Sequence, residues 1–186
     1  IPKGGAVMER LRRFIWYLAG RLFLLLTLLS LFTVTFYYAM NATNIYIVLK
    51  DGMAKRAQVI MMDEDASELT KFFQSSYLQR DQNLQIALEG KSPYTYYTVR
   101  GLDHRLKMTW MWCWPWDTTA RAEFTETIPR IDGRVKSSSA DAARALYGDG
   151  FEYPPKWQGG RYAATLVKEN GQWHVRSLTL LAQVDE

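Results

Sequence analysis

The stretch Leu22–Met40, LFLLLTLLSLFTVTFYYAM, holds 19 residues without a charged side chain and is rich in Leu and Phe. As a helix that rises about 1.5 Å per residue, it would span roughly 28 Å, close to the hydrocarbon thickness of a bilayer. The apolar sequence extends backwards to Phe14. A soluble domain of this size rarely covers so long an apolar helix on all sides. We therefore predict a transmembrane helix over residues 14–40 rather than a buried core helix.

Residues typical of the membrane interface flank this helix on both sides. Aromatic side chains gather at the two membrane–water boundaries because their rings are amphipathic, and arginine can extend its guanidinium towards the headgroups. The membrane lipid bilayer is therefore the first expected partner. The predicted interface residues are Arg12, Arg13, Trp16, Tyr17 and Arg21 at one end and Tyr37 and Tyr38 at the other.

The excess positive charge lies at the N-terminal end of the chain. Five of the 23 Lys and Arg residues and one of the 19 Asp and Glu residues precede Leu22, which leaves eighteen of each sign in the rest. The net charge is +4, but a neutral remainder argues against a nucleic-acid partner. Because basic flanks stay in the cytoplasm, we predict a cytoplasmic N-terminus and an extracytoplasmic C-terminal domain.

A cleaved secretory signal is the main alternative to an anchor. Its apolar core would have about 7–15 residues and would end at a small-x-small site. The observed run is longer, and Ala39 and Ala42 have no small residue two positions earlier. Residues 3–5, KGG, could be encoded by a purine-rich ribosome-binding sequence ahead of Met8, so residues 1–7 are expected to be an over-extended gene start. We predict an uncleaved signal-anchor in a bacterial cell membrane.

The sequence therefore divides into four segments. A length of 186 residues allows one folded domain in addition to the anchor. We expect a cytoplasmic tail over 1–13, a transmembrane signal-anchor over 14–40, a juxtamembrane helix over 41–62 and an extracytoplasmic α+β domain over 63–186.

Two helical patterns follow the anchor. Apolar residues between Asn44 and Met62 recur every three or four positions, which predicts a helix that continues from the anchor, with Gly52 as a hinge. The segment 65–68, DASE, is typical of a capping box. It predicts a second helix that ends near Leu78.

The second half of the chain is typical of β-structure. Period-two alternation over Leu106–Trp116 and Thr119–Ile128 predicts an antiparallel hairpin. Asn170-Gly171 lies between two apolar-rich runs and is a strong short-range signal of a second hairpin, over residues 161–183. Further expected elements are a strand over 94–99, a helix over 139–147 and a loop over 151–160.

The order of these elements resembles a known fold family. A helix pair, a curved antiparallel sheet and a closing hairpin, GRYAATLVKENGQWHVRSL, are similar to the nuclear transport factor 2-like (cystatin-like) α+β cone. With its anchor, the layout over 14–186 is similar to the bitopic assembly components of type IV secretion and conjugation machines, including their Gram-positive counterparts. The residue-level likeness rests on Gly171, Trp173 and Val175. The resemblance assigns no functional residue, because those families share no catalytic motif.

Few residues offer catalytic chemistry. Asp103 and His104 form a candidate general-base pair, but adjacent residues on a strand point to opposite faces. The histidines and the single cysteine, Cys113, have no metal-site spacing, and one cysteine cannot form an intrachain disulfide. We therefore expect no catalytic residues, no metal and no cofactor, and we keep Asp103 and His104 as the alternative.

Four tryptophans are the unusual feature of the domain. Strict alternation places them on one strand face and Met111 and Cys113 on the other. We expect them to pack the sheet against the helices. The alternatives are an apolar ligand pocket and an exposed patch for another protein. The residues predicted to share this face are Met108, Trp110, Trp112, Trp114 and Trp116.

Two classes of function remain. We expect a non-catalytic protein-interaction scaffold in a bacterial envelope assembly of the conjugation or type IV secretion kind. Its partners would be other envelope proteins or a second copy of the chain. The alternative is an anchored small-molecule-binding domain or a cone-fold enzyme that uses an aromatic pocket. The single anchor and the neutral domain favour the scaffold, whereas the tryptophans and the Asp103-His104 pair favour the pocket.

Overall fold

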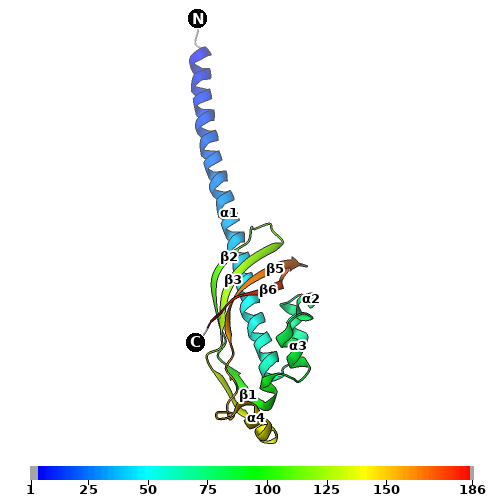
Figure 1. Cartoon of the computed structure of the whole chain (residues 1–186). Coiled ribbons are helices and arrows are strands. Elements are labelled where there is room, and N and C mark those ends of the chain that lie inside the picture. Colours follow the sequence, from blue (N-terminus) through cyan, green and yellow to red (C-terminus); the bar gives the residue numbers. More distant parts are fainter. Residues whose placement is uncertain (1–3, 185–186) are drawn as a thin grey trace. The chain divides into compact units, whose positions relative to one another are not determined.

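The computed structural model describes residues 4–184 and the side chains of residues 8–184. The chain separates into two compact units, residues 1–41 and residues 42–186. The second unit is an α+β domain in which helices accompany antiparallel sheets (Figure 1). The predicted fold class is confirmed at this level.

The first helix, α1 (Gly4–Met62), covers the predicted anchor and the predicted juxtamembrane helix without a break. Among the described residues, α1 is the one helix long and apolar enough to cross a membrane, and its apolar window is exposed. Hydroxyl groups within this window donate to the carbonyl four residues earlier, so they are satisfied inside their own helix, as lipid requires. These donors are Thr27, Ser30, Thr33 and Thr35. The helix therefore fits a single-pass membrane anchor.

Gly52 is a point of close packing and not the expected hinge. The helix continues through it. A Cβ atom at this position would lie 2.8 Å from the Cβ of Phe72 and 3.3 Å from the ring of Phe73. Because glycine has no side chain, the segment after α1 can pack directly on the helix backbone.

The single helix predicted over residues 65–78 is wrong. The chain forms a 3-10 helix, η1 (Ala66–Lys71), then an extended step at Phe73 and a short helix, α2 (Ser75–Leu78). Phe73 forms a parallel bridge with Val175 of the last strand. Backbone pairing with the sheet therefore replaces the helical hydrogen bonds at this point.

The main sheet has four antiparallel strands in the order β2-β3-β5-β6. Its strands are β2 (Arg105–Trp112), β3 (Thr119–Thr127), β5 (Gly159–Glu169) and β6 (Gln172–Val184). Figure 1 shows them crossing the second half of α1. The buried core joins the inner face of the sheet to α1, and its members include Ile45, Leu49, Met53, Ala122, Phe124, Leu166 and Val175. Both predicted hairpins are confirmed.

A β-bulge in β2 changes which side chains face the core. The register shifts between Met108, which pairs with Phe124, and Trp110, which pairs with Glu123. The extra residue is Thr109, so inward alternation restarts at Met111. Met108 therefore shares the inner face with Met111 and not with the tryptophans, and the predicted division of this strand is wrong.

Short elements that lie outside the main sheet complete the domain. Strands β1 and β4 pair antiparallel in a separate two-stranded sheet. The helix expected over residues 139–147 is confirmed as α4, whereas α3 and β4 were not anticipated. Their bounds are α3 (Gln82–Leu88), η2 (Pro93–Tyr96), β1 (Tyr97–Leu102), β4 (Ile131–Val135), η3 (Ser137–Ser139) and α4 (Ala140–Tyr147).

The turn between β5 and β6 has the backbone geometry that its sequence requires. Asn170 and Gly171 have φ angles of 50° and 83°, and the flanking Glu169 and Gln172 pair with each other. Positive φ at both central residues matches the right-handed twist of the strands. This local requirement sets the register of the longest hairpin in the domain.

Replacing Gly171 with Val should lower the free energy of unfolding by about 1 kcal/mol or more, because a β-branched residue resists positive φ. The matched control is Gly101→Val in β1, where φ is ordinary and an added Cβ atom meets no atom within 4 Å. Urea unfolding of the full chain in detergent micelles, followed by tryptophan fluorescence, measures both. Equal losses in the two variants would contradict a conformational role for Gly171.

Candidate functional site

The structure gives the side chains of Asp103 and His104 different hydrogen-bond partners. Asp103 lies near the surface and accepts a hydrogen bond from Arg105 at 2.7 Å. His104 points inward, where its Nε2 lies 3.0 Å from Oε1 of Glu126. The sequence suggested that Asp103 and His104 could act together as a general-base pair. In the structure, each of the two side chains interacts with a different residue.

Besides the His104–Glu126 contact, the interior holds a group of buried polar side chains around Arg56 and Asp81, and Glu126 lies near this group. Arg56 of α1 donates from Nε and Nη2 to the two carboxylate oxygens of Asp81, at 2.5 and 3.0 Å. Tyr77 donates its hydroxyl proton to the same carboxylate at 3.2 Å, and the Leu84 amide donates at 3.3 Å. Asp81 therefore caps α3 and joins it to α1 at once.

Burial and ion pairing shift the pKa values of Arg56 and Asp81 in opposite directions. Desolvation alone would raise the pKa of Asp81, but hydrogen bonds and charge from Arg56 hold it below its ordinary value. Desolvation alone would lower the pKa of Arg56, but Asp81 raises it, with smaller contributions from Tyr77 and Glu126. Burial raises the pKa of Tyr77 and also that of Tyr162. The ionised Arg56–Asp81 pair and the neutral phenols are therefore the favoured states.

The cluster is closed to solvent. Glu126 is 0% exposed, Arg56 6% and Asp81 7%. The second carboxylate oxygen of Glu126 has no hydrogen-bond partner among the described residues. A substrate could reach these groups only if α1 and the sheet moved apart. The Arg56–Asp81 pair therefore holds α1 and α3 together, because removing one partner from a buried pair leaves an uncompensated charge.

Sequence reasoning missed Arg56, Asp81 and Glu126. Arg56 carried a signal, because it lies beside Ala57 on the apolar stripe of α1, where a charge requires a partner. Asp81 and Glu126 each look like ordinary polar residues, one before a helix and one in an alternating strand. Only the folded chain brings them to the same interior.

Acid should destabilise the domain through Asp81. The folded pKa of Asp81 lies below the unfolded value, so the unfolded chain takes up a proton first, and stability falls as pH drops below about 4. Asp81→Asn should cost about 3–5 kcal/mol at pH 7 and should weaken this pH dependence. Urea unfolding at several pH values measures both effects, with the exposed Asp149→Asn as control. An unchanged acid response in Asp81→Asn would show that Asp81 does not contribute.

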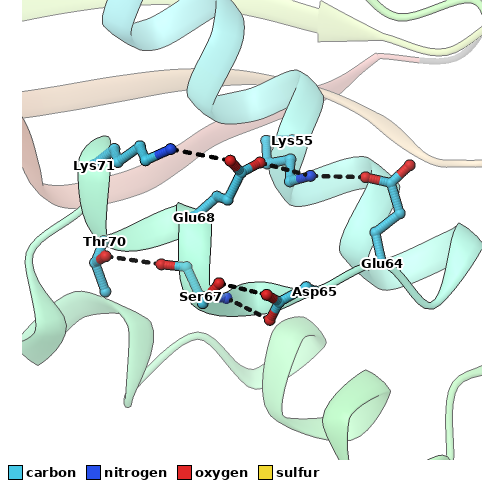
Figure 2. A network of polar contacts seen from close by, with 7 residues as sticks. All are labelled: Lys55, Glu64, Asp65, Ser67, Glu68, Thr70 and Lys71. Atoms are coloured by element: carbon cyan, nitrogen blue, oxygen red, sulfur yellow. Dashed lines mark hydrogen bonds and ion pairs between the residues drawn. The ribbon is translucent and has the colours of Figure 1, made fainter.

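A second polar network lies at the surface where α1 meets η1 (Figure 2). Lys55 contacts Glu64 at 2.8 Å and Glu68 at 3.0 Å, and Lys71 contacts the other oxygen of Glu68 at 2.9 Å. The hydrogen bonds that Lys55 donates to the carboxylates of Glu64 and Glu68 raise its pKa. Exposed pairs of this kind contribute little stability individually. The network links η1 to α1 through Lys55 and Glu68.

The structure places the four tryptophans at the surface, so the expectation that they pack the sheet against the helices is wrong. Their exposed fractions are 49% for Trp110, 47% for Trp112, 44% for Trp114 and 69% for Trp116. The Trp114 and Trp116 rings stack with centroids 5.4 Å apart, and Trp112 meets Trp114 edge-on at 5.2 Å. Cys113 points inward and is buried. The four residues form an exposed aromatic patch, here called the tryptophan patch.

A cavity of about 260 Å³ lies elsewhere in the domain. The last turn of α1, η2 and the start of β1 contribute to its wall with Met61, Tyr94 and Tyr97 respectively. Burial raises the pKa of Tyr94 to about 12. None of the four tryptophans lines this cavity, so the tryptophan patch and the cavity do not form one ligand site.

Comparison of the chain with models of known families gives no match, and comparisons with curated proteins and with solved structures give no significant match.

Proposed function

We propose that the chain is a single-pass bacterial membrane protein whose extracytoplasmic domain is a non-catalytic protein-interaction scaffold in an envelope assembly. A conjugation or type IV secretion-like machine is the setting that the resemblance favours. Its partners would be other envelope proteins or a second copy of the chain. The apolar helix that precedes the domain supports membrane attachment.

The proposal includes a nuclear transport factor 2-like cone for the domain. Support comes from the four-stranded antiparallel sheet with one face on α1, the short helices after α1 and the long closing hairpin of β5 and β6. The broken helix over residues 65–78 and the separate β1–β4 sheet are departures from a simple helix pair and single sheet.

The orientation rests on charge. Arg10, Arg12 and Arg13 precede the apolar run, and the rest of the chain is neutral, so the basic side would remain in the cytoplasm. Arg21 lies at the start of the uncharged run with its guanidinium 4.6 Å from the ring centroid of Tyr17. Such a pair suits the interface, where a cation and an amphipathic ring are both tolerated.

The observation that carries the scaffold proposal is the exposure of the C-terminal half of β6, residues 176–183. This strand lies at the edge of the main sheet, and every residue from Arg176 to Gln183 except Leu178 is exposed. Leu180 and Leu181 are 48% and 49% exposed. An edge strand with exposed leucines offers backbone hydrogen-bonding groups and apolar side chains to an added strand.

The enzyme or ligand-binding alternative has less support. Its candidate residues, Asp103 and His104, have separate partners, and the buried charges around Arg56 are closed to solvent. The observation in its favour is the cavity beside Tyr94, whose wall carries polar groups including Ser92 and Lys136.

Topology is tested by protease added to cells from which the wall has been removed. A tag after Glu186 should be digested, whereas a tag before Ile1 should be protected. Replacing Arg10, Arg12 and Arg13 with Glu should reduce digestion of the C-terminal tag, because positive charge retains a flank in the cytoplasm. A protected C-terminal tag in the unaltered protein would overturn the orientation.

Assembly through β6 is tested by Leu180→Asp with Leu181→Asp in the full chain. Both side chains are half exposed, so the domain should fold, but strand addition should weaken by tenfold or more, or about 1.4 kcal/mol. The matched control is Leu146→Asp on α4, where the leucine is 62% exposed. Native electrophoresis of membranes solubilised in mild detergent measures complex size. A complex that survives the β6 changes, or is lost equally with Leu146→Asp, would contradict the proposal.

A further inference from the structure

The tip of the β2–β3 hairpin and the β5–β6 turn lie at the same end of the main sheet. In the antiparallel register, Thr119 at the start of β3 pairs with Val167 near the end of β5. The Lys168 amide donates to the Thr118 carbonyl at 2.8 Å. Trp114 and Trp116 lie between β2 and Thr118, so they occupy the end of the sheet that also carries Gly171.

This end of the sheet lies beside the first turns of α1 in the domain. Asn44, Ile47 and Val48 line one hollow together with Gly171 and Trp173. The domain begins at Ala42, so these are the residues by which α1 enters it. Both hairpin ends therefore belong to the entry end of the domain.

The opposite end of the domain is built by other elements. The last turn of α1, up to Met62, lines a cavity with Tyr97, and the Tyr97 ring contacts the Tyr147 ring of α4 at 6.3 Å. From Ala42 to Met62, α1 rises about 30 Å. Leu146 on α4 therefore offers an exposed apolar side chain far from the entry end.

Sequence continuity joins the entry end to the apolar helix. The predicted anchor ends at Met40, two residues before the domain begins. The residues by which α1 enters the domain are therefore separated from the predicted anchor by very few residues. The sequence also places two residues typical of the membrane interface, Tyr37 and Tyr38, at the end of the predicted anchor.

The chemistry of the patch suits the lipid interface. An indole ring has a large apolar surface and one N–H donor, and it is enriched where hydrocarbon meets headgroups. Stacking of Trp114 on Trp116 gathers this apolar surface at the tip of the hairpin instead of burying it. Trp116, the residue nearest the turn, is also the most exposed of the four.

We propose that the tip of the β2–β3 hairpin, with Trp114 and Trp116 at its centre, lies in the headgroup region of the same membrane that holds the anchor. The tryptophan patch is then a second membrane contact in addition to the anchor. It touches the outer leaflet and is separate from the exposed edge of β6. This inference rests on the proposed single-pass topology. In this inference the tryptophan patch binds lipid, and protein partners bind other surfaces of the domain.

The test uses the full chain in phosphatidylcholine vesicles, with an environment-sensitive dye on one introduced cysteine in a Cys113→Ala background. Trp116→Cys reports the hairpin tip, Leu146→Cys the opposite end of the domain, and Leu29→Cys the apolar run. Phosphatidylcholine with a spin label near the headgroup, or deep in the acyl chain, serves as quencher. Trp116 is 69% exposed, so its replacement should leave the fold intact.

We expect blue-shifted emission at Trp116→Cys with quenching by the shallow label, deep quenching at Leu29→Cys, and water-like emission at Leu146→Cys. Water-like emission at Trp116→Cys while Leu29→Cys is quenched would overturn the inference and leave the anchor standing. Blue-shifted emission at Trp116→Cys without lipid quenching would assign the patch to a protein contact and would also overturn it. If Leu29→Cys is not quenched, the proposed anchor fails and the inference fails with it.

Discussion

The burial of one face of α1 beneath the main sheet is the constraint on which the rest of the domain depends. Ile45, Leu49 and Met53 are fully buried, although they belong to the same helix as the exposed apolar run before them. The domain therefore has to supply the partner that lipid would supply earlier in the chain. The inner faces of β3 and β5 do so with small and aromatic residues that fit against the helix.

Arg56 is a charged residue on the face of α1 that the domain buries. A guanidinium on the buried face of α1 requires a carboxylate, and Asp81 provides one while also capping α3. A buried ion pair of this kind is weak evidence for net stability, because an apolar pair of similar volume is often as stable. Its stronger effect is on geometry, since the ion pair and the Tyr77 hydrogen bond restrict where α3 can lie against α1.

The parts of the fold that were predicted from sequence depend on local rules. The continuous α1, the alternation of β3 and the Asn170-Gly171 turn follow from hydrophobic spacing and backbone preference within a few residues. The break at Phe73 was missed because its cause, pairing with Val175, lies at the far end of the sequence.

For the candidate site residues, too, local features were predicted and contacts between distant residues were not. His104 was singled out, but its partner is Glu126 on β3, 22 residues later in the sequence, and no spacing rule connects the two. The exposure of the tryptophans was missed because a bulge depends on how two strands pair and leaves no mark in the alternation of one strand alone. The fold class and the long apolar helix were therefore accessible from sequence, whereas the partners of the polar residues were not.

Thr109 has a role that its side chain does not explain. It is the additional residue in the β2 bulge, and every residue from there to the tip of the hairpin is shifted by its presence. In a strand of strict alternation, Met111 and Cys113 would face outward and the tryptophans inward. What β2 requires at this position is one more residue, whatever its chemical type, because the count of residues decides which side of the hairpin faces the core.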